Sequence, residues 1–155
     1  MAKKPEIERR GRSAERAALR HPSLASIEKH LARVRAIALA MPGASERKSH
    51  GEPTFFVGKR VFAMMSIDHH EDGRLAVLVP LAEGEQERLL AENPKRYYYP
   101  AYVGPSGWVG IHLSRISDAG LKRHVAAAWA LVAPKKRPGR ERPTRSITPS
   151  AAVGP

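Results

Sequence analysis

Cysteine is absent from the 155 residues of this sequence, which excludes disulfides, thiolate metal ligands and a cysteine nucleophile. Long hydrophobic runs are absent too, because the longest apolar stretch, residues 75–82, is far too short to span a bilayer. The first residues are basic and lack the apolar middle segment of a secretory signal. We therefore expect a cytoplasmic protein that does not enter a membrane.

Familiar catalytic and phosphate-binding motifs are missing as well. Ser49 and His50 are neighbours, but adjacent side chains rarely face one another for proton transfer, and no G-x-S-x-G elbow is present. Segment 51–60 has six residues between its glycines and an arginine after its lysine, so it is not a P-loop. Segment 68–72, DHHED, contains ligand residue types without a recognised metal spacing, and we interpret it as a solvated turn. We expect no enzyme, no metal and no cofactor.

The net charge of +12 is concentrated at the two ends of the chain. Residues 1–20 contain seven Lys or Arg and three Glu, and residues 134–155 contain six Lys or Arg and one Glu. Residues 21–133 contain 14 basic and 11 acidic groups. Basic tails attract phosphate through counterion release without reading sequence. They also serve as solubilising extensions, so the sequence leaves both roles open.

The length and composition predict one folded domain between two tails. We expect a basic flexible tail over residues 1–22 and a folded domain over 23–134. Residues 135–155 are rich in proline and poor in large apolar groups, so burial cannot offset the entropy of ordering them. They are predicted to be disordered.

Hydrophobic periodicity within the domain predicts the order α-βββ-α-ββ-α. The expected elements are a helix from Ser23 or Ser26 to Pro42, strands at 54–57, 60–67 and 74–80, a helix at 82–93, strands at 96–99 and 107–113, and a helix from Ser117 or Asp118 to Pro134. Hairpin-length links make the sheet mostly antiparallel. With helices on one face, the domain is α+β, a two-layer α/β sandwich.

Side-chain alternation in the strands predicts which groups face away from the helices. If the aliphatic sets of strands 60–67 and 107–113 face the helices, then Phe62, Met64 and Trp108 lie on the opposite face. That face is either covered by a partner, a tail or a ligand, or it forms a small second core closed by the tyrosine-rich loop.

Several spaced motifs resemble the MmcQ/YjbR family. They are MPGASERKSHGEPTFFVGKRVFAMM, the Asp72-Gly73 hairpin, an acidic helix ending in Asn93-Pro94, YYYPAYVGPSGWVGIHL and AWALVAP. The resemblance covers residues 27–134 and implies a secretion-chaperone-like α/β fold with the order given above. The family is described as predicted DNA-binding proteins with a double-wing motif, so the resemblance implies DNA binding. The basic tails lie outside the family pattern.

The candidate nucleic-acid-binding residues are basic or aromatic. They are Arg47, Lys48, Lys59, Arg60, Lys95 and Arg96 for phosphate, and Tyr97, Tyr99, Tyr102 and Trp108 for base stacking. Stacking contributes about 1–3 kcal/mol per base.

Strands separate all the helices, so no helix-turn-helix is expected. The sequence thus predicts a non-enzymatic protein that binds DNA or RNA through phosphate. The alternative is a module that binds a protein partner or a second copy through the apolar sheet face.

Overall fold

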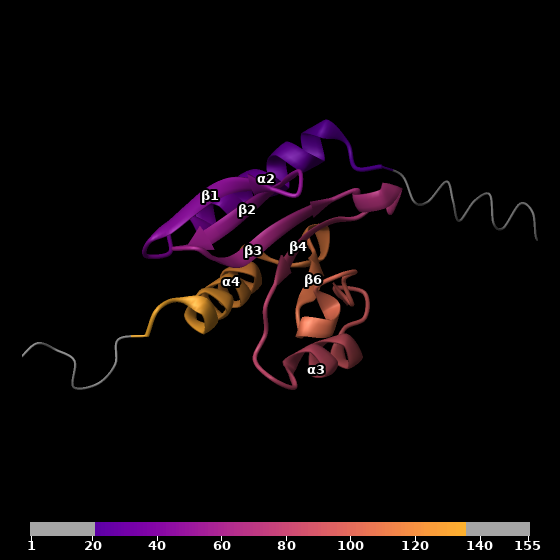
Figure 1. The fold of residues 1–155 in the computed structure, drawn as a ribbon. Coiled ribbons are helices and arrows are strands. Elements are labelled where there is room, and N and C mark those ends of the chain that lie inside the picture. The colour runs from indigo at the N-terminus through magenta and orange to yellow at the C-terminus, as the bar shows by residue number, and fades with distance from the viewer. Residues whose placement is uncertain (1–20, 136–155) are drawn as a thin grey trace, which may run out of the picture.

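A computed structural model describes residues 21–135 of the chain (Figure 1). The helices and strands are α2 (Leu24–Ala38), β1 (Ala44–Ser49), β2 (Glu52–Val57), β3 (Arg60–Ile67), β4 (Leu75–Val79), α3 (Glu85–Glu92), β5 (Tyr97–Tyr98), β6 (Val109–His112) and α4 (Asp118–Val132). Apart from a few residues at 21–22 and at 135, the two predicted tails lie outside the described residues. No helix within 21–135 has the length and apolar character needed to cross a membrane.

The two long helices begin where hydroxyl side chains can cap them. The Ser23 hydroxyl accepts a hydrogen bond from the Ser26 amide, and the Ser117 hydroxyl accepts one from the Gly120 amide, each at 3.1 Å. Such caps satisfy amides that have no partner within the helix. The structure therefore confirms both predicted starts to within a residue.

The six strands form one antiparallel sheet in the order β1-β2-β3-β4-β6-β5. Helices α2 and α4 contact each other and pack on one face of this sheet, whereas α3 lies beside β5 and β6 at the end farthest from β1 (Figure 1). The core between helices and sheet includes Phe55, Met65, Val77, Ile111 and Val125, all fully buried. The predicted two-layer α+β fold is confirmed.

Strand β1 was not predicted, so four strands rather than three precede α3. Its sequence, ASERKS, is polar, and none of its residues is fully buried, because it is an edge strand. It pairs with β2 through a two-residue turn, in which His50 and Gly51 have φ angles of 53° and 81°. Positive φ at both central residues is typical of a type I′ hairpin, but His-Gly is a weak sequence signal for one.

The prediction that Phe62 lies on the sheet face opposite the helices was wrong. Phe55 pairs with Ala63 and Phe56 pairs with Val61, which leaves Phe62 as an extra residue in a β-bulge. The bulge shifts the alternation of β3 by one residue. Phe62 consequently lies in the main core and is fully buried.

Candidate functional site

A cavity lies on the sheet face opposite α2 and α4, and three residues of one cross-strand row, Met64, Leu78 and Tyr98, line it. Thr54, Met64, Leu78, Gly110 and Tyr98 are successive Cα partners across β2, β3, β4, β6 and β5. Partners in register share one face of a sheet. None of these five residues belongs to the core under the helices, so this row faces the other way. We call it the helix-free face.

The wall of the cavity at β5 depends on a glycine. Gly110 is buried, and a Cβ atom at this position would overlap the Tyr98 ring. That ring has the His112 ring centroid 4.9 Å from its own centroid and the Arg74 guanidinium 4.2 Å from it. Burial raises the pKa of the Tyr98 hydroxyl above its usual value, so this group stays protonated and neutral.

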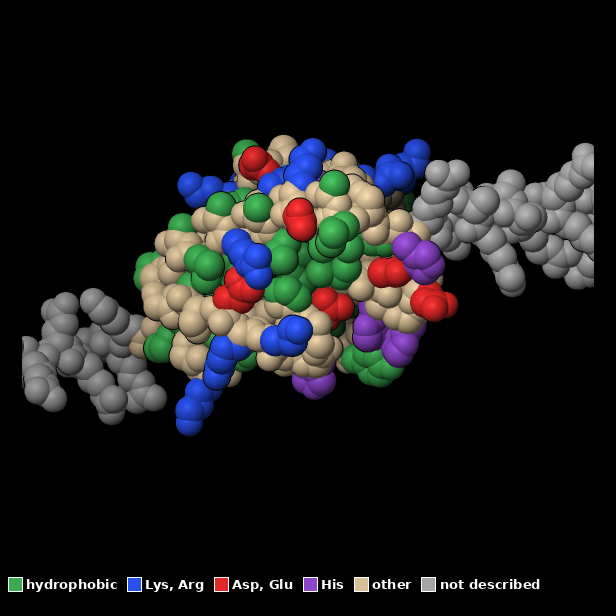
Figure 2. Space-filling model, turned by 90° about the horizontal axis from the view of Figure 1, so that it is seen from above, with side chains coloured by type: hydrophobic (Ala, Val, Ile, Leu, Met, Phe, Trp, Pro, Cys, Tyr) green, Lys and Arg blue, Asp and Glu red, His purple; other side chains and the backbone are tan. Residues whose placement is uncertain are grey.

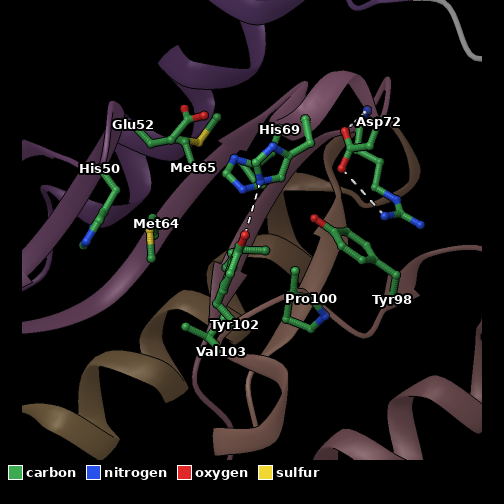
Figure 3. A pocket seen from close by; sticks show the side chains of 15 residues that line it. His50, Glu52, Met64, Met65, His69, Asp72, Tyr98, Pro100, Tyr102 and Val103 are labelled. Carbon is green, nitrogen blue, oxygen red and sulfur yellow. Dashed lines mark hydrogen bonds and ion pairs between the residues drawn. The ribbon is translucent and has the colours of Figure 1, made fainter.

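The cavity has a volume of about 520 Å³, within the range of small-molecule sites (Figure 3). Its apolar side includes Met64, Leu78, Pro100 and Val103. Tyr102 overhangs it, with φ of 65° and a side chain that is 77% exposed. The Tyr102 hydroxyl lies 3.3 Å from Nε2 of His70, which comes from the turn between β3 and β4. The loop between β5 and β6, which carries Tyr102, thus meets this turn over the helix-free face.

Glu52 is the polar group at the β2 side of the cavity. Its carboxylate accepts a long hydrogen bond of 3.4 Å from the amide of Ile67. No Lys, Arg or His in residues 21–135 forms a salt bridge with it. Burial raises the pKa of Glu52, and this effect exceeds the opposing effects of the Ile67 amide and Lys48. On the other side, the Asp72 carboxylate lies 3.7 Å from the Arg74 guanidinium.

The raised pKa of Glu52 makes stability depend on pH in a defined direction. Between the ordinary and the raised pKa the folded protein binds more protons than the unfolded chain, so stability falls as pH rises through that window. We expect E52Q to melt at a higher temperature than wild type at about pH 8, and to lose this advantage at about pH 4. Thermal unfolding at the two pH values measures this, and an advantage independent of pH would instead indicate a packing effect.

The predicted phosphate-binding pairs do not converge on one surface. Residues 47–48 lie in edge strand β1, residues 59–60 form the turn into β3, and residues 95–96 precede β5 at the opposite edge. The two edges are five strand spacings apart, or about 24 Å. Arg47 and Lys48 point to opposite faces, because Arg47 pairs with Thr54 on the helix-free face and strand residues alternate. Figure 2 also shows the Lys and Arg side chains in separate groups.

All six cations nevertheless share one property. None of them forms an ion pair with a carboxylate in the described part of the chain, whereas Arg33, Arg35, Arg74 and Arg88 all do. Arg47 instead lies with its guanidinium 4.0 Å from the centroid of the Phe56 ring. Arg96 donates a 2.9 Å hydrogen bond to the carbonyl of Arg115 and is half-buried, so it is the least available of the six.

The predicted stacking residues differ in exposure. Tyr97 is 5% exposed and belongs to the core, and its hydroxyl lies 2.6 Å from Nε2 of His124, so its ring offers no free face. Trp108 is half-buried, and its carbonyl accepts a hydrogen bond from Gln86. Tyr99 is 52% exposed and Tyr102 is 77% exposed. Only the last two have rings that are available to a base.

The cavity brings together residues that sequence reasoning did not select, namely Glu52, Ser66, Arg74, Leu78 and Tyr98. One signal was present, because a glycine inside a strand, as at position 110, often marks the close approach of another group. The DHHED turn contributes to the cavity roof. No group of three His, Asp or Glu side chains within residues 21–135 is arranged to hold a metal ion.

Comparison with known proteins gives a family and a fold. The family model described as YjbR matches residues 39–131. Among solved structures, protein DR2400 of Deinococcus radiodurans, described with the domain DUF419, is similar at a TM-score of 0.57 and 17% sequence identity. The match covers 66% of this chain and 77% of that one, and at this identity it shows the fold alone. No curated protein matches the sequence.

Proposed function

The chain belongs to the YjbR family, and we propose that it is a cytoplasmic, non-enzymatic protein that binds nucleic acid through phosphate. The main contacts are assigned to the basic edge, which we define as Arg47, Lys48, Lys59 and Arg60. The observation that carries this proposal is that these four exposed cations, none with a carboxylate partner within residues 21–135, lie together on edge strand β1 and on the adjoining turn into β3. A carboxylate partner within the protein would neutralise a cation and so reduce its attraction for phosphate.

The position of the basic edge suits a nucleic-acid backbone. Strand β1 is an edge strand, and the turn between β2 and β3 lies next to its first residue, Ala44, which pairs with Val57. A strand of phosphates can therefore follow one side of the sheet without entering the core. The guanidinium groups of Arg47 and Arg60 can each hold two phosphate oxygens. The basic stretches at both ends of the sequence add cations to the same electrostatic attraction.

The same arrangement supports contact with the backbone rather than reading of duplex sequence. Each helix is separated from the next by strands, so no helix-turn-helix is formed within residues 21–135. Phosphate contacts do not by themselves distinguish DNA from RNA. We therefore propose single-stranded DNA or RNA as the ligand, with the available rings of Tyr99 and Tyr102 as stacking groups.

Neutralising the basic edge should weaken binding and reduce its dependence on salt. We expect R47Q/K48Q/K59Q/R60Q to bind a labelled single strand about 10- to 100-fold more weakly at low salt, and to lower the salt slope by up to about 3. Fluorescence anisotropy between about 50 and 200 mM salt measures both quantities.

The matched control is K29Q/K122Q/R123Q/K135Q, which removes the same charge from exposed positions on and after the helices. It should retain most of the affinity. An equal loss in the two variants would mean that only net charge matters, and would reject the basic edge as a site. Thermal unfolding of both variants checks that neither effect comes from misfolding, since Arg47 also packs on Phe56.

A protein partner or homodimer on an apolar sheet face has less support. Phe62, one of the three residues on which that alternative depended, lies in the main core, and Met64 lines the cavity floor. The helix-free face is partly covered by Tyr98 and by the loop that carries Tyr102. This arrangement supports a small second core with a cavity rather than a broad apolar surface.

A further inference from the structure

We propose that the cavity on the helix-free face holds one unstacked base of the bound strand and prefers guanine, with Glu52 accepting hydrogen bonds from its edge. This inference rests on the proposed nucleic-acid binding, because the base arrives as part of a strand. It adds a base-recognition site to a protein whose other contacts do not read sequence.

The shape and lining of the cavity suit a flat aromatic group. Its volume of about 520 Å³ falls in the range that encloses small ligands, and a base with its sugar is a small ligand. Met64 and Leu78 offer an apolar floor, and the Tyr102 ring projects beside the opening (Figure 3). Proteins commonly hold a splayed-out base between apolar and aromatic side chains in this way.

The two carboxylates in the cavity disfavour phosphate and favour a neutral group that donates hydrogen bonds, and three histidines, His50, His69 and His70, also line it. Two carboxylates, Glu52 and Asp72, line it, and its one arginine, Arg74, already contacts Asp72 and the Tyr98 ring. Glu52 has no cationic partner in the described part of the chain and accepts only one long hydrogen bond. Its acceptor capacity is therefore available to a ligand.

Guanine matches a carboxylate better than the other bases do. Its N1–H and its N2 amino group are adjacent donors, so they can meet the two carboxylate oxygens together. Adenine and cytosine each present one amino group beside an acceptor nitrogen, and that acceptor would face a carboxylate oxygen. Thymine and uracil present a single N–H between two carbonyls.

The cavity also lies at a suitable distance from the basic edge. Arg47 pairs with Thr54, and Thr54 pairs with Met64 on the cavity floor. Two strand spacings, about 10 Å, therefore separate Arg47 from the floor. A strand whose phosphate contacts Arg47 can place the attached base in the cavity.

The first test compares labelled thymidine oligonucleotides of about seven nucleotides that carry one central guanine, adenine or cytosine, or none. We expect the full-length protein to bind the guanine oligonucleotide about tenfold more tightly than the all-thymine one. E52Q should lose this preference and bind the all-thymine strand as wild type does. The control E87Q removes the same charge from an exposed position on α3 and should keep the preference.

A guanine preference that E52Q leaves intact, or the absence of any preference in wild type, would overturn the inference while leaving phosphate binding in place. Guanosine, adenosine and uridine without phosphate form the second arm, measured by NMR chemical-shift changes. If wild type binds guanosine and E52Q does not, the cavity site is supported. This conclusion holds even if the basic-edge variant R47Q/K48Q/K59Q/R60Q binds strands normally. Failure of guanosine to perturb any residue of the cavity would count against it.

Discussion

Replacing Gly110 with alanine is expected to destabilise the protein and to close the cavity. The new Cβ would overlap atoms of the Tyr98 ring, so the ring would have to move. It cannot move easily, because His112 and Arg74 pack against it. Forcing a methyl group into a packed site of this kind typically costs about 1–3 kcal/mol. A fall of several degrees in Tm measured by circular dichroism would show it.

Gly104→Ala is the matched control, because its Cβ would overlap the Tyr99 ring in the same way. The difference is that Tyr99 is 52% exposed and can rotate into solvent, so we expect a much smaller change in Tm. Two equal and small changes would mean that the Tyr98 ring is not fixed. The double variant Y98A/G110A removes the overlap. Its loss of unfolding free energy should therefore be smaller than the sum of the losses in Y98A and G110A. Guanosine binding should be lost in G110A and retained in G104A.

The sequence predicted most of the fold because local signals agreed with one another. Apolar spacing gave both long helices, and the Ser23 and Ser117 caps fixed their starts. Strand β3 was predicted with its exact limits, since Arg60–Ile67 is apolar, rich in large side chains and bounded by turn residues. The polar edge strand β1 was missed, because its pairing depends on a turn rather than on any apolar pattern.

The site was much less predictable, since it depends on register. The cavity lies over a row of residues drawn from five strands, and the bulge changes the side that the start of β3, with Phe62, faces, whereas Met64 keeps the face that alternation predicts. Alternation counted along one strand cannot detect such a bulge. The prediction grouped Arg47 with Lys95 as phosphate contacts, yet these residues lie at opposite edges of the sheet. Strand order, which sequence spacing does not specify, decides that separation.

Phe62→Ala distinguishes the observed register from the one that simple alternation predicts. If Phe62 faced away from the helices, its loss would change binding more than folding. In the structure it is fully buried in the main core, so we expect the variant to lose about 3–5 kcal/mol of unfolding free energy. Urea denaturation measures this loss directly.

Met64→Ala gives the opposite pattern and is the natural comparison. Met64 lies two residues further along β3, is only partly buried and borders a cavity that is already open to solvent. Truncating it removes little packing, so we expect about 1 kcal/mol of destabilisation or less, with weaker guanosine binding. A large stability loss at Met64 together with a small one at Phe62 would contradict the bulge. Since the bulge places Phe62 under the helices while Met64 stays on the cavity side that alternation predicts, this pair of variants tests fold and site at one point.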